Sequence, residues 1–413
     1  MIVWSLFAVG GVYVWAGAPL VAAAVLLAAV ARPKPGTSRE TRMLDRLLIV
    51  SVATVATQLV PLPSAVRDVV SPHADEIRSA IYLGPASVAA WRPISVSPVS
   101  TAYALALVLT ALVVFWTARA ACGRGMGRRI VRHVALTGIV AALVAIGLSA
   151  GSDPWLIYGR WQPLDAGARP FGPFVNRNHF ATWVLMACPL AAGYVAAALD
   201  ARRRSPILGV KLAAWLEGIG TSAMWVGAAG VVMILALVIS TSRSGLIGFC
   251  ASLAGGAWLA RDRLTRRTGG LGGVIAVIAL AVIALAAILA AFVNVQPLVS
   301  RLEETVAVGA GGRPRIWQET LRLSRDFWLT GTGLGGYQTA MSVYQQTDRT
   351  VFINQAHNQY LHLLTEGGVL LMVPAVMAVA AFIRLFRMRL EQDTSSSVWL
   401  RIGGGAALLA VAM

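Results

Sequence analysis

The chain has 413 residues, of which 57% are hydrophobic and 13% are charged. So small a charged fraction excludes an ordinary soluble domain, because it cannot cover the apolar surface of the long hydrophobic stretches. The net charge of +17 could indicate a nucleic-acid-binding protein, but the basic residues lie in short clusters between apolar stretches, without a nucleic-acid-binding motif. The composition therefore predicts an all-α, polytopic membrane protein that lies in the lipid bilayer and binds no nucleic acid.

The apolar stretches, taken in chain order, predict about 10 to 11 transmembrane helices, since one span needs about 20 residues. The first stretch, 2–31, could form one tilted helix or a hairpin of two short helices divided near Gly17-Ala18-Pro19. Further spans are expected at 44–60, 98–118, 134–150, 179–199, 219–240, 244–260, 271–293, 367–386 and from 398 onward. The last stretch is short for a span when it reaches Met413, so we expect the C-terminus to be truncated.

The charges between these stretches predict which loops face the cytoplasm. Of the 35 Lys and Arg residues, 22 lie in five loops, at 32–46, 119–132, 200–217, 261–267 and 384–401. These loops hold only 7 of the 18 Asp and Glu residues, and loops rich in Lys and Arg stay inside. The other loops are then extracytoplasmic. We predict a single membrane domain over 1–413, in which 294–365 is a long periplasmic loop that carries short helices.

Polar residues border several apolar stretches on the predicted outer side. In the first group, Asn176, Asn178 and His179 precede a span; one Asn could cap the helix, but capping does not explain consecutive polar residues. In the second group, Arg243 lies between two apolar stretches with Ser, Thr and Gly as neighbours. It could snorkel to water, but an arginine at this depth is costly without a partner, and its planar guanidinium matches phosphate oxygens.

The other two groups lie in the long loop and at its end. Arg313 and Arg315 open a predicted amphipathic helix, where a bound anion would offset the unfavourable placement of arginine at a helix start. The alternative is solvated loop surface, which we expect for Arg322 and Arg325. His357 could accept a proton near neutral pH and so activate a hydroxyl.

The end of the long loop also contains a second histidine. His362 and Glu366 share a helix face at i,i+4 spacing, but His357 lies five residues before His362 and off that face. We therefore predict no metal and expect this pair to be interfacial scaffolding. Asn358 would orient His357 or cap the helix. Arginines that hold a diphosphate, with a histidine that deprotonates a hydroxyl, predict group transfer from a lipid-linked diphosphate without a cofactor.

Four segments carry a resemblance to a known family: "GPFVNRNHFA", "STSRSG", "GRPRIW…GTGLGGY" and "HNQYLHLLTEGG". Over roughly residues 45–390 the chain resembles the O-antigen ligase/polymerase superfamily of bacterial membrane proteins. The resemblance implies a metal-independent glycosyltransferase of the inner (cytoplasmic) membrane, with its active site facing the periplasm and an undecaprenyl-diphosphate-linked glycan as donor. It makes His357 the catalytic base, and assigns diphosphate binding to Arg243 and to Arg313, with Arg315 as a second candidate. Support of the substrate or the structure is expected from Asn176, Asn178, His179, Trp317, Asn358 and Tyr360.

The motifs leave several reactions open. The acceptor could be another glycan, as in an O-antigen or exopolysaccharide polymerase, or lipid A-core, as in an O-antigen ligase of lipopolysaccharide biosynthesis. It could also be a protein hydroxyl, as in an O-oligosaccharyltransferase. A transporter of a small anion or glycolipid is an alternative, although the predicted spans carry almost no charges along a path. A structural membrane partner without activity is a third.

Overall fold

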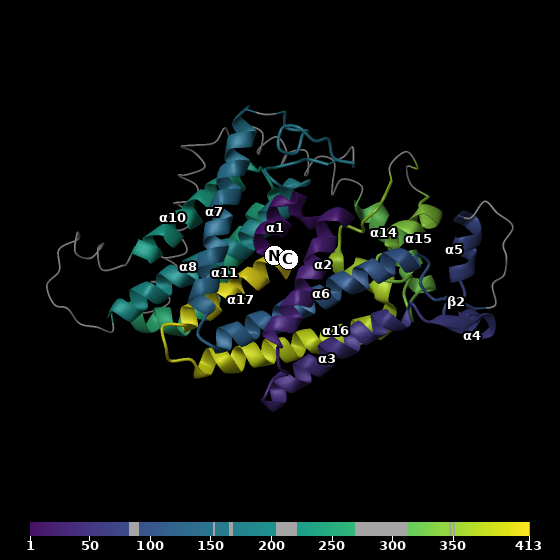
Figure 1. The fold of residues 1–413 in the computed structure, drawn as a ribbon, viewed down its shortest axis with the longest axis horizontal. Helices are drawn as coiled ribbons and strands as arrows, with labels where there is room; N and C mark the ends of the chain where they lie inside the picture. Colours follow the sequence, from purple (N-terminus) through teal and green to yellow (C-terminus); the bar gives the residue numbers. More distant parts are fainter. Residues whose placement is uncertain are drawn as a thin grey trace. The chain divides into compact units, whose positions relative to one another are not determined.

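The computed structural model describes residues 1–81, 91–151, 153–164, 168–203, 221–268, 313–346, 349 and 352–412. Most of them are helical (Figure 1). Within these ranges, six helices are long and apolar enough to cross a membrane: α2 (Val14–Ala31), α6 (Pro98–Gly123), α7 (Gly127–Gly151), α8 (Arg177–Arg203), α10 (Thr221–Ile239) and α16 (Gln359–Gln392). The predicted fold class, a polytopic helical membrane protein, is confirmed.

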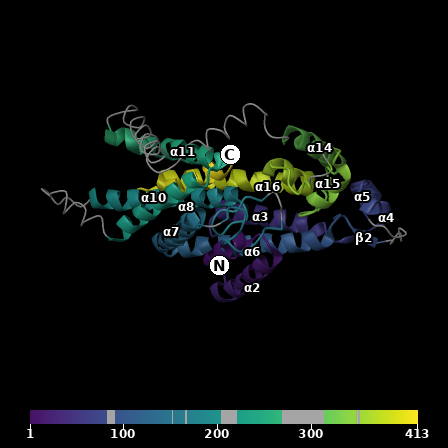
Figure 2. The same ribbon diagram turned by 90° about the horizontal axis from the view of Figure 1, so that it is seen from above.

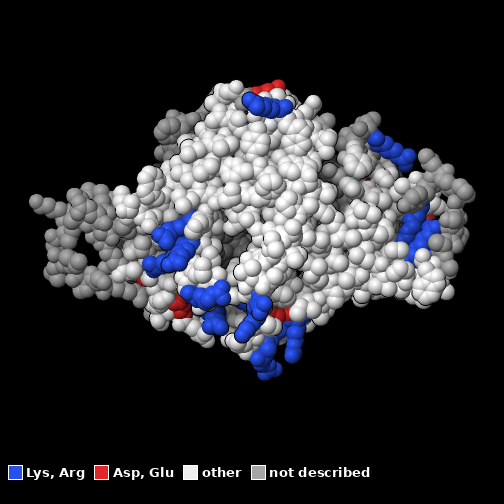
Figure 3. All heavy atoms as spheres, in the orientation of Figure 1, with Lys and Arg blue, Asp and Glu red and all other residues white. Residues whose placement is uncertain are grey.

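The surface agrees with this class. On the face drawn in Figure 3, Lys and Arg side chains gather in small groups, with wide uncharged areas between them. On α16, the side chains of Val369, Val373, Val376 and Val379 are between 39% and 58% exposed. An apolar helix face this open is solvated by lipid in a membrane protein.

Three other predicted spans coincide with helices outside these six. They are α3 (Arg39–Thr57), α11 (Arg243–Thr268) and α17 (Val398–Ala412). The predicted span at 271–293 lies outside the described residues.

The first apolar stretch breaks earlier than the sequence predicted. The helix α1 (Ile2–Phe7) is followed by a 3-10 turn, η1 (Val9–Gly11), in which Gly10 has a φ of 68°. Pro19 instead lies inside α2. Since a helix rises about 1.5 Å per residue, α1 is about 9 Å long and cannot cross a bilayer. The stretch therefore forms neither one continuous helix nor a hairpin divided near Gly17-Ala18-Pro19, and α2 is its one helix of membrane length.

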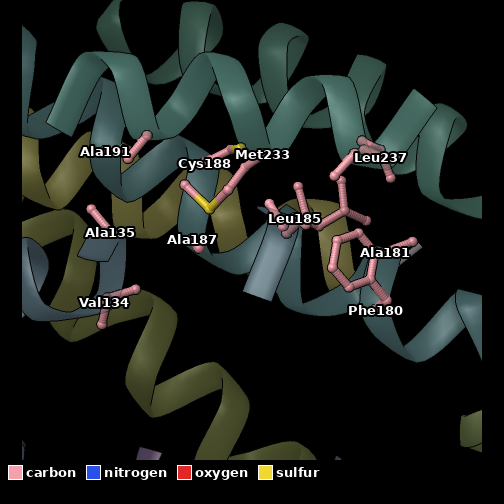
Figure 4. Packing of buried hydrophobic residues seen from close by; sticks show 14 of the residues in the cluster. Val134, Ala135, Phe180, Ala181, Leu185, Ala187, Cys188, Ala191, Met233 and Leu237 are labelled. Carbon is pink, nitrogen blue, oxygen red and sulfur yellow. The ribbon is translucent and has the colours of Figure 1, made fainter. Parts of the chain in front are cut away.

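The described helices belong to two compact units. The first unit comprises Met1–Ala23, Ala121–Glu303 and Arg389–Met413, and the second comprises Ala24–Ala120 and Glu304–Met388. In the first unit α7, α8 and α10 pack side by side (Figures 1 and 2), and α11 and α17 pack on α8. Figure 4 shows its core, where Met233 and Leu237 of α10 lie near Leu185 of α8. The single membrane domain stays a prediction.

Segments that the charge count places on one side meet at one end of the first unit. Arg128, at the start of α7, donates to Ser396 Oγ at 2.9 Å, and Arg263, near the end of α11, donates to the carbonyl of Asp393 at 2.8 Å. Both acceptors lie in the predicted cytoplasmic loop 384–401. The loop before α8 and the turn between α10 and α11 lie at the opposite ends of these helices.

In the second unit, a buried carboxylate joins α3 to α6. Asp45 accepts hydrogen bonds from Arg119 Nη1 at 2.6 Å, from Trp116 Nε1 at 2.9 Å and from the backbone N–H of Gly36 at 2.8 Å. Charge-assisted hydrogen bonds of this kind are the strong ones in proteins. They fix the basic segment before α3 against both helices.

The other end of the second unit carries small elements. They are α4 (Ser64–Val70), α5 (Ala74–Ile81), α14 (Arg313–Asp326), α15 (Tyr337–Tyr344) and two antiparallel strands, β1 (Pro61–Pro63) and β2 (Trp91–Pro93), with Leu62 opposite Arg92. Their shared core contains Ile77, Leu323, Phe327, Tyr337 and Met341. The long loop thus carries short helices in its described part, as predicted.

The glycine-rich segment after α14 is a packed crossing with α16. Gly331 has a φ of 70°, and the backbone N–H of Gly333 donates to the carbonyl of Glu366 at 3.1 Å. The same carbonyl accepts a hydrogen bond from Gln58 Nε2 at 2.8 Å. At this point α16 is interrupted, because Gly368 has a φ of 57° and a ψ of −168°. The crossing is therefore fixed by hydrogen bonds from three segments.

Gly331→Ala is expected to lower the free energy of unfolding by at least about 1–3 kcal/mol, because alanine is strained in a left-handed conformation. In addition, a Cβ there would overlap the carbonyl group of Glu366. The control is Gly147→Ala on α7, where a Cβ meets no atom within 4 Å and helix propensity improves. Thermal unfolding of the purified variants in detergent measures the difference; equal midpoints would contradict the prediction.

An ion-pair cluster of two buried arginines and a partly exposed carboxylate holds α4 and α5 together. Arg67 is 1% exposed and donates to one oxygen of Asp75 from Nε at 3.0 Å and from Nη2 at 2.6 Å. Arg78 donates to the other oxygen of Asp75 at 2.6 Å. Burial alone would raise the pKa of the Asp75 carboxyl, but the hydrogen bonds from the two arginines outweigh it and hold this pKa below its ordinary value of 3.8.

The low pKa of Asp75 predicts a loss of stability in acid. A carboxyl with a lower pKa in the folded chain stabilises the fold fully above its ordinary pKa, and this contribution is lost as the pH falls through the folded pKa. Asp75→Asn removes this dependence and the charged partner of Arg67. Because the Asp75 side chain is 40% exposed and water screens the pair, we expect the free energy of unfolding at neutral pH to fall by about 1 kcal/mol. Unfolding followed from about pH 3 to pH 7 tests this. Asp68→Asn, an exposed position on α4, should unfold like the wild type throughout.

Candidate functional site

The structure brings the first two polar groups together in the first unit. Asn176 caps α8, since its Oδ1 accepts the backbone N–H of Asn178 at 2.8 Å. Asn178 Oδ1 in turn accepts a hydrogen bond from Ser242 Oγ at 2.8 Å, and Arg177 Nη1 donates to Thr241 Oγ1 at 3.3 Å. The start of α8 is thus bonded to the turn that precedes α11. His179, the last of this group, is exposed beside it.

Arg243 is the first residue of α11. Ser242 caps this helix, because its Oγ accepts the backbone N–H of Gly245 at 3.2 Å. The Arg243 side chain is half-buried, and its guanidinium makes no hydrogen bond or ion pair with the described residues. A cation at a helix N-terminus opposes the helix dipole, whereas an anion bound there is attracted by both the guanidinium and the free backbone N–H groups.

The third and fourth polar groups meet in the second unit. Trp317 Nε1, on α14, donates to the carbonyl of Ala356 at 2.9 Å, next to His357. Arg313 is the first residue of α14, and only its backbone is described; Arg315 is exposed. The helix that carries both arginines is therefore tied to the segment that carries the histidine.

Asn358 caps α16. Its Oδ1 accepts the backbone N–H groups of Tyr360 and Leu361, each at 3.1 Å, so of the two roles predicted for it the structure shows capping. His357 is exposed and has a φ of 51°, a left-handed conformation that costs a residue other than glycine about 1–3 kcal/mol. Tyr360 is 64% exposed beside it.

The remaining polar residues of this region have structural surroundings. His362 Nε2 lies 3.4 Å from Glu366 Oε1, and Glu366 is buried, which agrees with scaffolding. Arg322 and Arg325 are exposed, as expected for solvated surface, and Arg322 donates to Gln346 Oε1 at 3.1 Å.

Residues 228–376 match the family model described as O-antigen ligase. Over this segment the chain is similar to the O-antigen ligase family. This match supports the O-antigen ligase superfamily, which is the resemblance that the motifs predicted. Comparisons with curated proteins and with solved structures gave no significant match.

The matched segment begins within α10 and ends within α16, so it contains Arg243, α14 and His357. The polar group at the start of α8 precedes it. Within the matched segment, sequence reasoning gave no role to Ser242 or to Tyr337. A serine directly before a helix start is an N-cap signal that could have identified Ser242. Tyr337 makes contacts that no local pattern indicates.

Proposed function

We propose that the chain is a membrane glycosyltransferase that moves a glycan from an undecaprenyl-diphosphate-linked donor to an acceptor hydroxyl on the periplasmic face. The observation that carries this proposal is the match of residues 228–376 to the O-antigen ligase family, which supports an O-antigen ligase/polymerase-type glycosyltransferase. The matched segment includes Arg243, whose guanidinium makes no bond with the described residues, and His357, which is exposed and has a left-handed backbone. The strong excess of Lys and Arg in the opposite loops supports the periplasmic side.

In this proposal each candidate residue has one role. Arg243 binds the diphosphate and neutralises the charge that develops on it. Arg313, with Arg315 as a second candidate, is also assigned to diphosphate binding. His357 takes the proton of the acceptor hydroxyl. The acceptor oxygen then forms a bond to the anomeric carbon, while the bond from this carbon to the diphosphate oxygen breaks. The leaving undecaprenyl diphosphate keeps the electron pair of that bond, so the step is redox-neutral and needs no oxidant.

Transfer in a purified system tests the proposal. The protein, reconstituted with a lipid-linked glycan donor and a hydroxyl acceptor, should produce elongated acceptor and free undecaprenyl diphosphate, with an equal yield in EDTA. A glycan, lipid A-core and a protein are offered as acceptors in parallel. The preferred acceptor shows whether the protein is a polymerase, a ligase or an O-oligosaccharyltransferase. Absence of transfer, together with uptake of a labelled anion or glycolipid by vesicles that contain no donor, would favour a transporter instead.

The surface glycans of a deletion strain separate the two main reactions. Single repeat units left on lipid A-core would identify a polymerase. Lipid-linked glycan that accumulates unattached would identify a ligase. Unchanged surface glycans would favour a structural membrane partner and contradict the proposal.

A further inference from the structure

The residue before His357 is held from two sides. Ala356 is fully buried, and its carbonyl accepts the hydrogen bond from Trp317 Nε1 at 2.9 Å. Its backbone N–H donates to His362 Nδ1 at 3.4 Å. Both backbone groups of Ala356 are therefore bonded to side chains, one from α14 and one from α16. A buried backbone group without a partner is costly, so these two bonds fix where the chain runs before His357.

The bond from Ala356 also indicates the tautomer of His362. Nδ1 accepts a hydrogen bond, so the ring proton lies on Nε2, which faces Glu366 Oε1 at 3.4 Å. The same Glu366 oxygen accepts the backbone N–H of Tyr337 at 3.0 Å, and the Tyr337 ring lies 4.5 Å from the His362 ring. His362 is thus held in one orientation by contacts on both of its nitrogens and on its ring.

A further hydrogen bond connects this arrangement back to α14. Thr320 Oγ1 donates to the carbonyl of Ile316 at 2.7 Å, so the Tyr337 hydroxyl, at 2.8 Å, donates to Thr320 Oγ1. Thr320 lies one helical turn after Trp317. The connections therefore form a closed ring from α14 through α15 and α16 to Ala356 and back to α14.

We propose that Trp317 and His362 are positioning residues for His357. By binding the carbonyl and the N–H of Ala356, they hold the His357 backbone in its left-handed conformation and orient the imidazole toward the acceptor hydroxyl. A conformation that costs about 1–3 kcal/mol persists only where its surroundings over-determine it, and the two bonds supply this constraint. The inference rests on the proposed function, in which His357 is the base.

Three substitutions separate positioning from general stability. Trp317→Phe keeps an aromatic ring at this position but removes the indole N–H donor. His362→Gln offers a donor to Glu366 but no acceptor at the position of Nδ1, whereas His362→Asn keeps an acceptor there. We expect Trp317→Phe and His362→Gln to lower kcat by about 10- to 100-fold with the donor KM unchanged, because small misplacements of a reacting group have effects of this size. His362→Asn should stay closer to the wild type.

Hydrogen–deuterium exchange supplies a readout that does not depend on activity. The peptide that contains Ala356 should exchange faster in Trp317→Phe and His362→Gln than in the wild type. The matched control is Tyr344→Phe, which loses the hydrogen bond from the Tyr344 hydroxyl to Asp326 at 2.6 Å but leaves Ala356 untouched. This control should change neither kcat nor the exchange of that peptide.

The outcomes distinguish this inference from the proposed function. Faster exchange with a lower kcat, in these two variants and not in the control, supports positioning. Unchanged exchange overturns it, as does faster exchange with wild-type kcat while His357→Ala is inactive. If His357→Ala itself transfers glycan at the wild-type rate, the role of His357 as base fails, and the inference fails with it.

Discussion

His357→Ala is expected to lower the rate of glycan transfer by about 10²- to 10⁴-fold, which is the contribution of a positioned general base. Without the imidazole, the acceptor hydroxyl has no group to take its proton and remains a weak nucleophile. The side chain is exposed, so its removal creates no cavity in the core. Initial rates of transfer from a lipid-linked donor measure the effect, and thermal unfolding confirms that both proteins are folded.

The control for this substitution is another exposed histidine. His133 lies on α7, near the predicted cytoplasmic end, and its Nδ1 is 2.7 Å from the carbonyl of Arg129. His133→Ala should transfer at the wild-type rate. If the two variants have the same rate, His357 is not the base.

Arg243→Ala is expected to lower the rate of glycan transfer by about 10²- to 10³-fold. Removing one group that stabilises the charge of a transition state has an effect of this size in other enzymes. The side chain makes no hydrogen bond or ion pair with the described residues, so we expect its loss to act on the proposed diphosphate binding and to leave the fold intact. Arg243→Lys should recover only part of the rate, because an ammonium cannot bind two phosphate oxygens as a planar guanidinium does. The release of undecaprenyl diphosphate measures this step directly.

The matched control for Arg243 lies at the other end of the same helix. Arg261 is exposed, 3.5 Å from Asp262, and its guanidinium lies 5.0 Å from the centre of the Trp258 ring. Arg261→Ala should leave transfer unchanged. A similar loss of rate in both variants would mean that net charge matters and that Arg243 does not bind the diphosphate.

The sequence predicted the fold class because apolar stretches and charge clusters are local properties. It predicted the wrong break in the first stretch for a physical reason. A proline usually marks the end of a helix, but membrane helices tolerate proline, and Pro19 lies inside α2. The chain turns instead at Gly10, which has a positive φ. Which of the two residues, Gly10 or Pro19, ends the helix depends on how this segment packs, and composition does not report packing.

Individual residues of the candidate site could be predicted from the sequence, but the contacts between them could not. Polar groups beside apolar stretches identified Arg243 and His357. The bond from Trp317 to Ala356 joins residues 39 positions apart, and the bond from Ser242 to Asn178 joins residues 64 positions apart. Such contacts depend on how helices pack, so no periodicity within one segment indicates them.

The interruption of α16 at Gly368 determines how this helix responds to membranes of different thickness. An apolar helix adjusts to a thinner or thicker bilayer by changing its tilt. The backbone changes direction at Gly368, and the crossing is bonded on both sides of this glycine, since the N–H of Gly333 donates to the carbonyl of Glu366 and the N–H of Val369 donates to the carbonyl of Trp328 at 2.8 Å. We therefore expect a change of tilt to be confined to the turns after Leu370 and to leave the segment around His357 in place when the lipid composition changes.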